Sequence, residues 1–343
     1  MMSPILEEIP SPPPNKIGWP WTEESPKLSK TMLNNSPWPK ISIVTPSYNQ
    51  GKFLEETIRS ILLQGYPNLE YIIIDGGSID ESVEIIKKYE KWLAFWISEK
   101  DRGQSHAINK GFAKASGDIY AYINSDDLYC PGALSSIAPI FKKNGDPHLV
   151  AGECVIFEGT KVKRIFTPWW PERLSYFVEK TYSSTFAQPA SFWSKEIYED
   201  LGGFDQSLNF CFDREFFLRI GLAGVNPYLI DRKVARFREH SESKTILQGI
   251  RFHEESISII KRHAKDCGIS NRKKKKIIAK TTVEIFYIDV FRKWKDKGRL
   301  SALLRYFQMI IRYPVSLLDR KILGQFRRIV TFRASNVDDL NKI

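Results

Sequence analysis

The amino-acid sequence predicts an α/β fold with a doubly wound, mostly parallel sheet, followed by a C-terminal helical region. Two patterns support this prediction. From residue 41 onward, short apolar runs rich in β-branched residues alternate with segments of helical periodicity, as expected for strands that are buried on both faces and connected by helices. Beyond residue 246, apolar residues recur at helical spacing and basic residues fill the gaps between them.

The alternation gives the order of the elements. Helices are predicted over residues 51–64, 82–92 and 104–115, and strands over residues 41–48, 69–75, 94–100, 118–124 and 149–157. After residue 157 the alternation breaks, which predicts a less regular second half. Ahead of it, residues 1–40 contain the clusters PSPPP and PWP. Proline fixes φ and removes a backbone donor, so this lead-in is expected to be extended and poorly ordered.

Composition limits the classes of protein that fit the chain. With 343 residues, 42% of them hydrophobic, it can bury one large core or two modest ones. Its four cysteines lie far apart and form no C-x-x-C pair, which argues against a zinc or disulfide framework and favours a cytoplasmic location. No apolar run reaches the ~18 residues of a membrane-spanning helix, and the acidic, proline-rich start is unlike a secretion signal.

The net charge of +11 is unevenly distributed. Residues 271–343 contain 19 Lys or Arg and 6 Asp or Glu, and the rest of the chain is close to neutral. Two interpretations stay open: a helical cap with a solvated basic face, and an amphipathic surface that lies peripherally on an anionic membrane, at its inner face. Nucleic acid is not expected as a partner, because no recognised motif accompanies the charge.

Polar clusters follow three of the predicted strands. Residues 45–49 (TPSYN) follow the first strand, residues 75–78 (DGGS) the second, and residues 124–127 (NSDD) the fourth. Ligands of open parallel sheets bind outside the carboxyl ends of the strands, so the three clusters predict one binding site. Neither G-x-G-x-x-G nor G-x-x-x-x-G-K-[ST] occurs, which argues against a dinucleotide-binding fold and a P-loop.

Asp126 and Asp127 are adjacent carboxylates that repel each other unless a cation neutralises them. Mg²⁺ or Mn²⁺ typically takes one or two carboxylates together with substrate phosphates. The pair therefore predicts a divalent-metal site. A solvated turn or the N-cap of a following helix is the alternative.

Taken in order, the motifs resemble the nucleotide-sugar half of family 2 glycosyltransferases, which have the GT-A fold. The resemblance rests first on IVTPSYNQGKFLEETIRSILLQ, YIIIDGGSIDES and SEKDRGQSHAINKGFAKASGDIYAYINSDD. It continues through QPASFW, LGGFD, FDREFFLRI and FREHSESKT. It implies a GT-A-like catalytic domain over residues 41–245, preceded by the lead-in of residues 1–40 and followed by a basic helical region over residues 246–343.

The resemblance also implies roles for single residues. Those that would line the nucleoside pocket, the last of them near the base or ribose, are Thr45, Pro46, Tyr48, Asn49 and Asp75. Those that would contact the diphosphate and a Mn²⁺ or Mg²⁺ ion are Asp126, Asp127 and His240. Asp213 matches the carboxylate that serves as general base in inverting members. Two positions depart from the family pattern: Asn124 replaces the first Asp of the D-x-D element, and Gly76 replaces a carboxylate that can read the base.

Several assignments have simpler alternatives. Asp75 can form a tight turn, Asp213 can cap the helix that follows it, and His240 can be a surface residue. Arg102 is predicted to assist the departing diphosphate, or else to be a solvated loop cation. Asn109, like His106, is predicted to reach the donor sugar, or else to be an exposed helix position.

The expected function is that of a metal-dependent, inverting glycosyltransferase of hexosyltransferase type. It would move a sugar from a nucleoside-diphosphate sugar to a hydroxyl of a glycan or lipid-linked glycan, in surface polysaccharide or glycolipid synthesis. Gln188 and the pair Trp169–Trp170 are candidates for acceptor contacts, although the tryptophans can equally belong to the core. The rivals are a nucleotide-sugar hydrolase and a non-catalytic sugar- or membrane-binding module.

Overall fold

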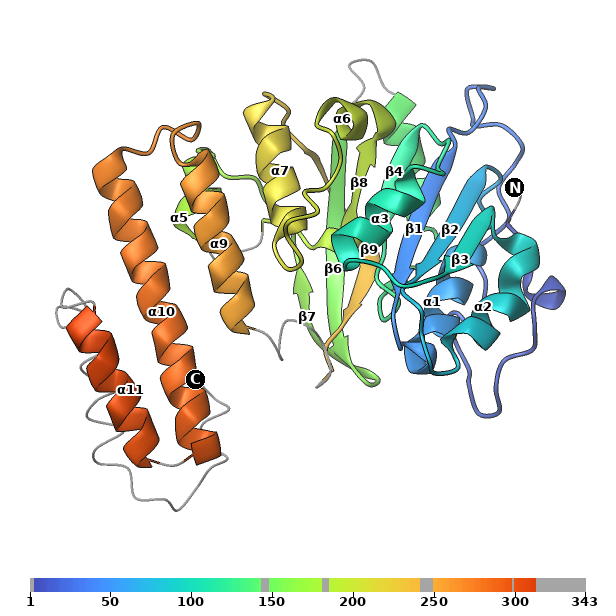
Figure 1. Cartoon of the computed structure of the whole chain (residues 1–343). Helices are drawn as coiled ribbons and strands as arrows, with labels where there is room; N and C mark the ends of the chain where they lie inside the picture. Colours follow the sequence, from blue (N-terminus) through green and yellow to red (C-terminus); the bar gives the residue numbers. More distant parts are fainter. Residues whose placement is uncertain (1–2, 143–147, 181–184, 241–248, 298, 313–343) are drawn as a thin grey trace. The chain divides into compact units, whose positions relative to one another are not determined.

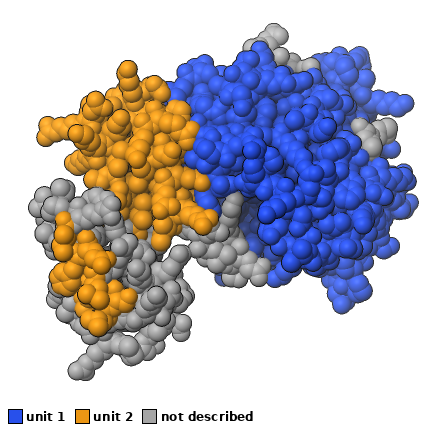
Figure 2. Space-filling view, in the orientation of Figure 1, with its two compact units in different colours: residues 1–174, 182–243 blue, residues 175–181, 244–343 orange. Residues whose placement is uncertain are grey.

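The computed structural model describes residues 3–142, 148–180, 185–240, 249–297 and 299–312. The chain divides into two compact units (Figure 2): unit 1 comprises residues 1–174 and 182–243, and unit 2 comprises residues 175–181 and 244–343. The predicted boundary between residues 245 and 246 lies outside the described residues. The division into lead-in, catalytic domain and basic region stays a prediction.

In its described residues, unit 1 is built on one sheet with the strand order β3-β2-β1-β4-β8-β6-β9-β5, and β7 pairs with β6 (Figure 1). The strands are β1 (Ile41–Ser47), β2 (Leu69–Asp75), β3 (Phe95–Ser98), β4 (Ile119–Tyr122), β5 (Leu128–Tyr129), β6 (Leu149–Glu158), β7 (Lys161–Phe166), β8 (Ser191–Ser194) and β9 (Tyr228–Arg238). The α-helices are α1 (Gly51–Leu62), α2 (Ser82–Tyr89), α3 (Gln104–Phe112), α4 (Ala133–Ile137), α6 (Lys195–Asp200) and α7 (Phe212–Leu222). Short 3₁₀ turns are η1 (Leu6–Glu8), η2 (Glu90–Trp92), η3 (Ala138–Lys142) and η4 (Gln188–Ala190).

Strands β1 to β4 run parallel, as the sequence predicts. Their register aligns Ser47 with Asp75 and Asp75 with Ser98. The carboxyl ends of β1, β2 and β3 therefore lie at one edge of the sheet, and the polar clusters that follow the strands gather there.

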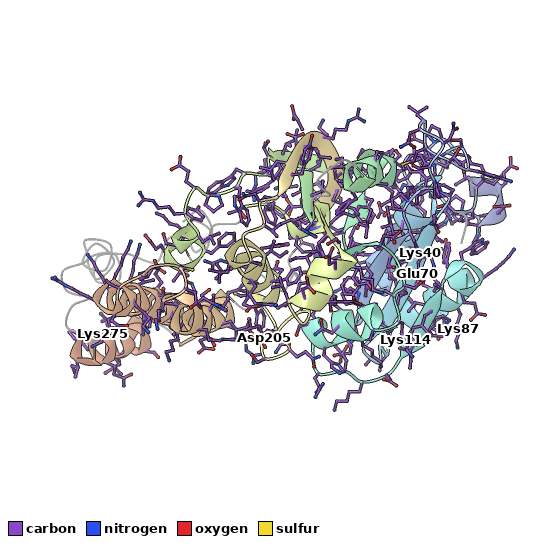
Figure 3. The ribbon with its side chains drawn as sticks, turned by 90° about the horizontal axis from the view of Figure 1, so that it is seen from above. Lys40, Glu70, Lys87, Lys114, Asp205 and Lys275 are labelled. Atoms are coloured by element: carbon purple, nitrogen blue, oxygen red, sulfur yellow. The ribbon has the colours of Figure 1, made fainter. Side chains whose placement is uncertain are left out.

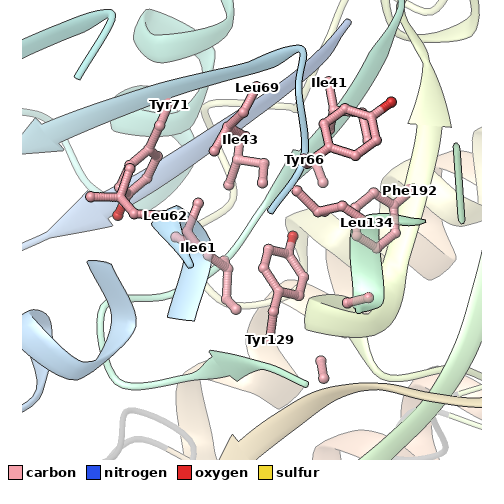
Figure 4. Close-up of a cluster of buried hydrophobic side chains, with 14 of the residues drawn as sticks. Ile41, Ile43, Ile61, Leu62, Tyr66, Leu69, Tyr71, Tyr129, Leu134 and Phe192 are labelled. Atoms are coloured by element: carbon pink, nitrogen blue, oxygen red, sulfur yellow. The ribbon is translucent and has the colours of Figure 1, made fainter. Parts of the chain in front are cut away.

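Helices cover both faces of this parallel half. On one face, α1 and α2 pack on a cluster that includes Ile41, Ile43 and Tyr71 (Figure 4). On the other face α3 comes so close that a Cβ atom on Gly111 would lie 2.5 Å from a methyl group of Val44. The doubly wound α/β arrangement predicted from the apolar runs is confirmed.

The second half of the sheet is mixed. β8 runs antiparallel to β4 and to β6, whereas β6 and β9 run parallel. β5 follows the Asn124–Asp127 segment directly and pairs antiparallel with β9, with Leu128 opposite Arg236. Because of this pairing, the end of β9 arrives beside the adjacent carboxylates of Asp126 and Asp127.

The described part of the proline-rich lead-in, residues 3–40, is packed on the domain rather than poorly ordered. Arg59 of α1 is fully buried and donates hydrogen bonds to the backbone carbonyls of Pro10, Pro20 and Trp21 at 2.7–3.1 Å. Its guanidinium also lies 5.3 Å from the ring centre of Trp21. A proline-rich segment offers carbonyl groups without N–H groups, and a buried arginine supplies the missing donors.

A polar cluster fastens the opposite edge of the sheet. Glu70 accepts hydrogen bonds from the Ser42 hydroxyl at 2.5 Å and from the backbone and hydroxyl of Ser116 at 2.6 Å. Lys40 lies 3.5 Å from the same carboxylate (Figure 3). The amino ends of β1 and β2 are thereby tied to the turn before β4.

Unit 2 is helical in its described residues, as its apolar spacing predicts. Its helices are α5 (Ser175–Glu179), α9 (Gly249–His263), α10 (Asn271–Lys297) and α11 (Arg299–Arg312). Lys273 of α10 forms an ion pair with Glu179 of α5 at 2.7 Å. Within the described parts of both units, every helix is too short or too polar to span a bilayer.

Candidate active site

The loop after β2 closes around the start of α1. Three consecutive backbone N–H groups, of residues 49–51, donate to Ser78 Oγ at 2.8 Å, Ser82 Oγ at 3.1 Å and Asp80 Oδ2 at 2.9 Å. Asn49 has a φ of 51°, and its side-chain oxygen accepts from the backbone of Ile79 at 2.9 Å. The D-G-G-S-I-D-E-S motif thus acts as an external cap for α1.

Asp75 shapes the same loop. One of its oxygens accepts from the backbone N–H groups of Gly77 and Ser78 and from the Ser98 hydroxyl, and the other accepts from the Ser78 hydroxyl. The residue is fully buried. These bonds match the tight-turn alternative, and the predicted contact of Asp75 with a base or ribose stays a prediction.

An exposed ring and a carboxylate both lie close to Gly76. A Cβ atom at this position would be 3.3 Å from the Tyr48 ring and 2.8 Å from Asp101 Oδ2. Tyr48 is 62% exposed, and Asp101 is fixed by a 2.7 Å hydrogen bond from the Gly103 N–H to its other oxygen. An oxygen of Asp101, in the loop after β3, therefore lies next to the position at which the family pattern has a carboxylate.

Asp126 and Asp127 lie on the turn between β4 and β5. The next element is a strand, so the alternative that this pair caps a helix is wrong. Asp126 Oδ2 lies 2.9 Å from His240 Nε2, just past the end of β9. Asp127 is 1% exposed, and its Oδ1 accepts from the backbone N–H of Arg238 at 2.9 Å. The structure thus pairs His240 with Asp126, and Asp127 follows on the same turn with one carboxylate oxygen bound to the Arg238 N–H.

The negative charge of Asp126 acts on the buried Asp127 carboxyl. Burial, and next the negative charge of Asp126, raise the pKa of Asp127 well above its usual value. Hydrogen bonds from Arg238 and Asn124 oppose this rise without cancelling it. A bound cation would relieve the same repulsion, because it favours the ionised form of both groups.

The residues present fit a hard divalent ion whose shell a diphosphate completes. Within the described ranges, no three His, Cys, Asp or Glu side chains form a ready-made metal cage. Mg²⁺ and Mn²⁺ do not need one, since one or two carboxylates plus substrate phosphates suffice. Asp126 and Asp127 would hold the ion, with His240 beside them, and the ion would supply positive charge to the phosphates.

Asp213 sits in the first turn of α7, where its Oδ1 accepts from the Arg214 N–H at 2.7 Å. The buried Tyr122, at the end of β4, is influenced by the charges of both Asp213 and the acidic pair. Burial raises the pKa of Tyr122 well above its usual value, and the charges of Asp213 and then Asp127 raise it further. Both carboxylates therefore lie within electrostatic range of one buried hydroxyl.

A clamp holds the helix that carries Asp213. The buried Glu215 accepts from Arg219 Nε at 2.9 Å through both oxygens. The two terminal nitrogens of Arg219 donate to the carbonyls of Leu201 and Gly203 at 2.6 and 2.7 Å. All three nitrogens of the guanidinium thus donate hydrogen bonds, which fixes α7 to the L-G-G turn.

Asn109 is bound to the same turn. Its carboxamide oxygen accepts from the Tyr198 hydroxyl and the Phe204 N–H, and its nitrogen donates to the Phe204 carbonyl at 2.7 Å. These bonds hold α3 to the turn after α6, and the predicted contact of Asn109 with a donor sugar stays a prediction. Gln188 is likewise buried and donates to the Tyr122 carbonyl at 2.7 Å.

The other predicted residues are divided between site and core. Arg102, in the loop after β3, is exposed and donates to Gln206 Oε1 at 2.9 Å. Thr45 and Pro46 are buried in β1, and the Thr45 hydroxyl accepts from Tyr71 at 3.1 Å. Trp170 stacks on Phe186, with ring centres 5.8 Å apart, as its core alternative predicts.

Sequence reasoning missed Arg238 and Glu56. Arg238 Nη2 forms a 2.9 Å ion pair with Glu56 Oε2, across 182 residues of sequence. Arg238 belongs to the F-R-E-H segment, of which the sequence analysis used only His240. A buried arginine next to two aspartates leaves no periodic signal, so only the fold reveals it.

The matched family model is that of glycosyl transferase family 2, over residues 42–202. An uncharacterized glycosyltransferase of Mycobacterium tuberculosis is 29% identical over 186 residues, which cover 54% of this chain and 70% of that protein. TuaG of Bacillus subtilis, named as a teichuronic acid biosynthesis glycosyltransferase, is 37% identical over 94 residues, or 26% of this chain and 37% of TuaG.

Among solved structures, the fold is similar to that of S. aureus TarS, residues 1–349, with a TM-score of 0.55, 18% identity and 82% of each chain covered. At this identity the likeness concerns the fold, which is that of GT-A enzymes. Residues 42–202, just under half of the chain, thus match the model of glycosyl transferase family 2, and the fold around them is similar to that of GT-A enzymes.

Proposed function

We propose that this glycosyltransferase is metal-dependent and inverting, with Asp213 as general base and Asp126 and Asp127 as metal ligands. The observation that carries the proposal is the strand-end turn of Asp126 and Asp127, with His240 2.9 Å from Asp126, and the charges of Asp127 and Asp213 both reach the buried Tyr122 hydroxyl. A donor diphosphate at the acidic pair would thus present its sugar toward Asp213.

The chemistry follows from these positions. An acceptor oxygen attacks the anomeric carbon from the face opposite the diphosphate, the bond from that carbon to the phosphate oxygen breaks, and Asp213 takes the hydroxyl proton. Negative charge grows on the departing diphosphate. A divalent ion held by Asp126 and Asp127 would stabilise that charge, and Arg102 would add to it from the loop after β3.

The nucleoside would lie against Tyr48 and Asp101, which are both next to Gly76. The exposed Tyr48 ring offers a stacking surface, and the Asp101 carboxylate accepts hydrogen bonds. A uracil or guanine ring carries an N–H donor that suits this acceptor. Asn49 and Asp75 would support the pocket by holding the two loops that form it.

The acceptor is proposed to be a hydroxyl of a surface polysaccharide or of a lipid-linked glycan. The similarity to TuaG supports a polysaccharide. A nucleotide-sugar hydrolase is the rival, and it differs in passing the sugar to water.

A thermal-shift panel of UDP-, GDP- and dTDP-sugars, each with and without Mn²⁺, tests the donor site. One nucleotide should raise Tm only when Mn²⁺ is present, and saturation to about 100 times Kd should add roughly 2.7 kcal/mol. The absence of any shift would contradict the proposal and favour a non-catalytic module. Turnover that is independent of added glycan acceptors would favour the hydrolase.

We further propose that unit 2 contacts an anionic membrane through α11. Leu300, Leu304, Phe307 and Ile311 are spaced by three or four residues and are each more than half exposed, so they share one face of the helix. The strongly basic composition of residues 271–343 favours a negatively charged surface over a second copy of the chain.

Replacement of Leu304 and Phe307 by serine in the full chain should weaken binding to phosphatidylglycerol vesicles about tenfold or more, since each buried side chain contributes ~1.5–3 kcal/mol. Cosedimentation measures this, and high salt should weaken binding further. The matched control replaces Val162 and Ile165, exposed apolar residues of β7, and should bind like wild type. Equal binding of the α11 variant would refute the membrane contact.

A further inference from the structure

The turn that carries Asp126 and Asp127 is held from one side by α1. The Thr57 hydroxyl lies 3.0 Å from the Ser125 carbonyl and 2.8 Å from the Asp127 carbonyl. The carbonyl between them, that of Asp126, accepts from Arg238 Nε at 2.9 Å. The single Thr57 O–H is shared between the first and third carbonyls and Arg238 Nε donates to the middle one, so the backbone of the turn is held from two elements.

Arg238 makes the largest contribution to this arrangement. Its backbone N–H holds Asp127 Oδ1, its Nε holds the Asp126 carbonyl, and its Nη2 pairs with Glu56 of α1, each at 2.9 Å. The residue is 8% exposed. One side chain thus connects β9, the acidic turn and α1.

Two aromatic rings orient the guanidinium. Its central carbon lies 4.9 Å from the ring centre of Phe53 and 4.6 Å from that of Phe157. A planar cation that stacks on aromatic rings and also donates from both Nε and Nη2 is a task for arginine, because the lysine ammonium is neither planar nor forked. Phe53 also contacts the His240 ring, with ring centres 4.8 Å apart. The ring that packs on Arg238 therefore also packs on His240, the third proposed metal contact.

We propose that Arg238 is the positioning residue of the metal site: it fixes the Asp126–Asp127 turn and the end of β9 so that the acidic pair and His240 face one ion. This inference rests on the proposed metal dependence. Arg238 acts through the carboxylates and not on the ion itself. Partners of this kind that orient metal ligands typically change metal affinity 10- to 100-fold when they are lost.

The test measures Mn²⁺ affinity of the full chain in the presence of UDP, by titration calorimetry or by the electron-spin signal of free Mn²⁺. Arg238→Met keeps the length and removes the charge, and Arg238→Lys keeps the charge and removes the fork. Both should weaken Mn²⁺ binding about 10- to 100-fold. Arg236→Met is the matched control, because Arg236 lies over the same Phe157 ring at 4.5 Å from a neighbouring position of β9. It should bind Mn²⁺ like wild type.

The outcomes separate this inference from the proposed function. If both Arg238 variants bind Mn²⁺ like wild type while Asp127→Asn does not, the metal site stands and the positioning role falls. If wild type itself does not bind Mn²⁺, the metal dependence falls and the positioning role with it. Glu56→Gln provides a second measurement if Arg238→Met does not fold: it keeps a carbonyl acceptor, removes the ion pair, and should weaken Mn²⁺ binding in the same direction.

Discussion

Asp213→Asn should lower kcat by about 10²- to 10⁴-fold, the usual contribution of a general base, and leave donor binding close to that of wild type. Asparagine has the same shape and retains the oxygen that accepts from the Arg214 N–H, so α7 should keep its first turn. It cannot take a proton from the acceptor. Because the lost interaction exists only in the transition state, kcat and kcat/KM should fall together.

The measurement is steady-state transfer with the donor and acceptor that the panel identifies. Asp200→Asn is the matched control: Asp200 is an exposed residue at the end of α6, and its loss of charge should leave kcat unchanged. Transfer by Asp213→Asn at the wild-type rate would show that another group takes the proton. A rise in KM at constant kcat would instead assign Asp213 to substrate binding.

Asp127→Asn should abolish Mn²⁺-dependent donor binding and, at the same time, stabilise the metal-free protein. The folded protein raises the pKa of the Asp127 carboxyl. Such a group binds more protons in the folded than in the unfolded state, so its contribution to stability falls as pH rises from the unfolded pKa toward and through the folded one. At neutral pH, ionisation of Asp127 therefore destabilises the folded, metal-free wild type. The asparagine of the variant does not ionise and avoids this destabilisation.

Two measurements on the same samples check this prediction. Tm in the presence of a chelator should rise by at least ~2 °C, the change that about 1 kcal/mol produces in a domain of this size. With Mn²⁺ and the donor, the order should reverse, because only wild type gains from the ligand. Asp231→Asn, an exposed carboxylate on β9, should change neither value. A metal-free variant less stable than wild type would contradict the electrostatic account.

The sequence predicts those parts of the fold that local patterns determine. Apolar runs place β1 and β2 to within a residue, because a strand buried on both faces needs such a run along its whole length. The polar clusters at the strand ends identify the site, since parallel strands bring their carboxyl ends to one edge. Asp126 and Asp127 can be predicted as site residues from the sequence alone, because adjacent carboxylates repel each other unless a cation neutralises them.

The remaining features depend on partners that are distant in sequence. Arg59 lies on the buried side of an amphipathic helix, where a charge is unexpected until the carbonyls of the lead-in are seen around it. In the sequence, Asn109 is an ordinary polar residue of a helix. Only the folded structure shows that its amide binds the backbone of Phe204, in the turn after α6. Arg238 and Glu56 belong to the same class. Buried polar pairs follow tertiary geometry rather than periodicity.

The cap on α1 has a consequence for how the enzyme handles anions. In many nucleotide-binding α/β proteins the phosphates rest on the amino end of a helix, where free N–H groups and the helix dipole attract them. Here the N–H groups of residues 49–51 already serve two serines and the carboxylate of Asp80. The Asp80 carboxylate at the amino end of α1 would repel a diphosphate. The amino end of α1 therefore serves to close the loop after β2, and in the proposed mechanism the charge of a departing diphosphate would be balanced by the metal ion and Arg102 instead.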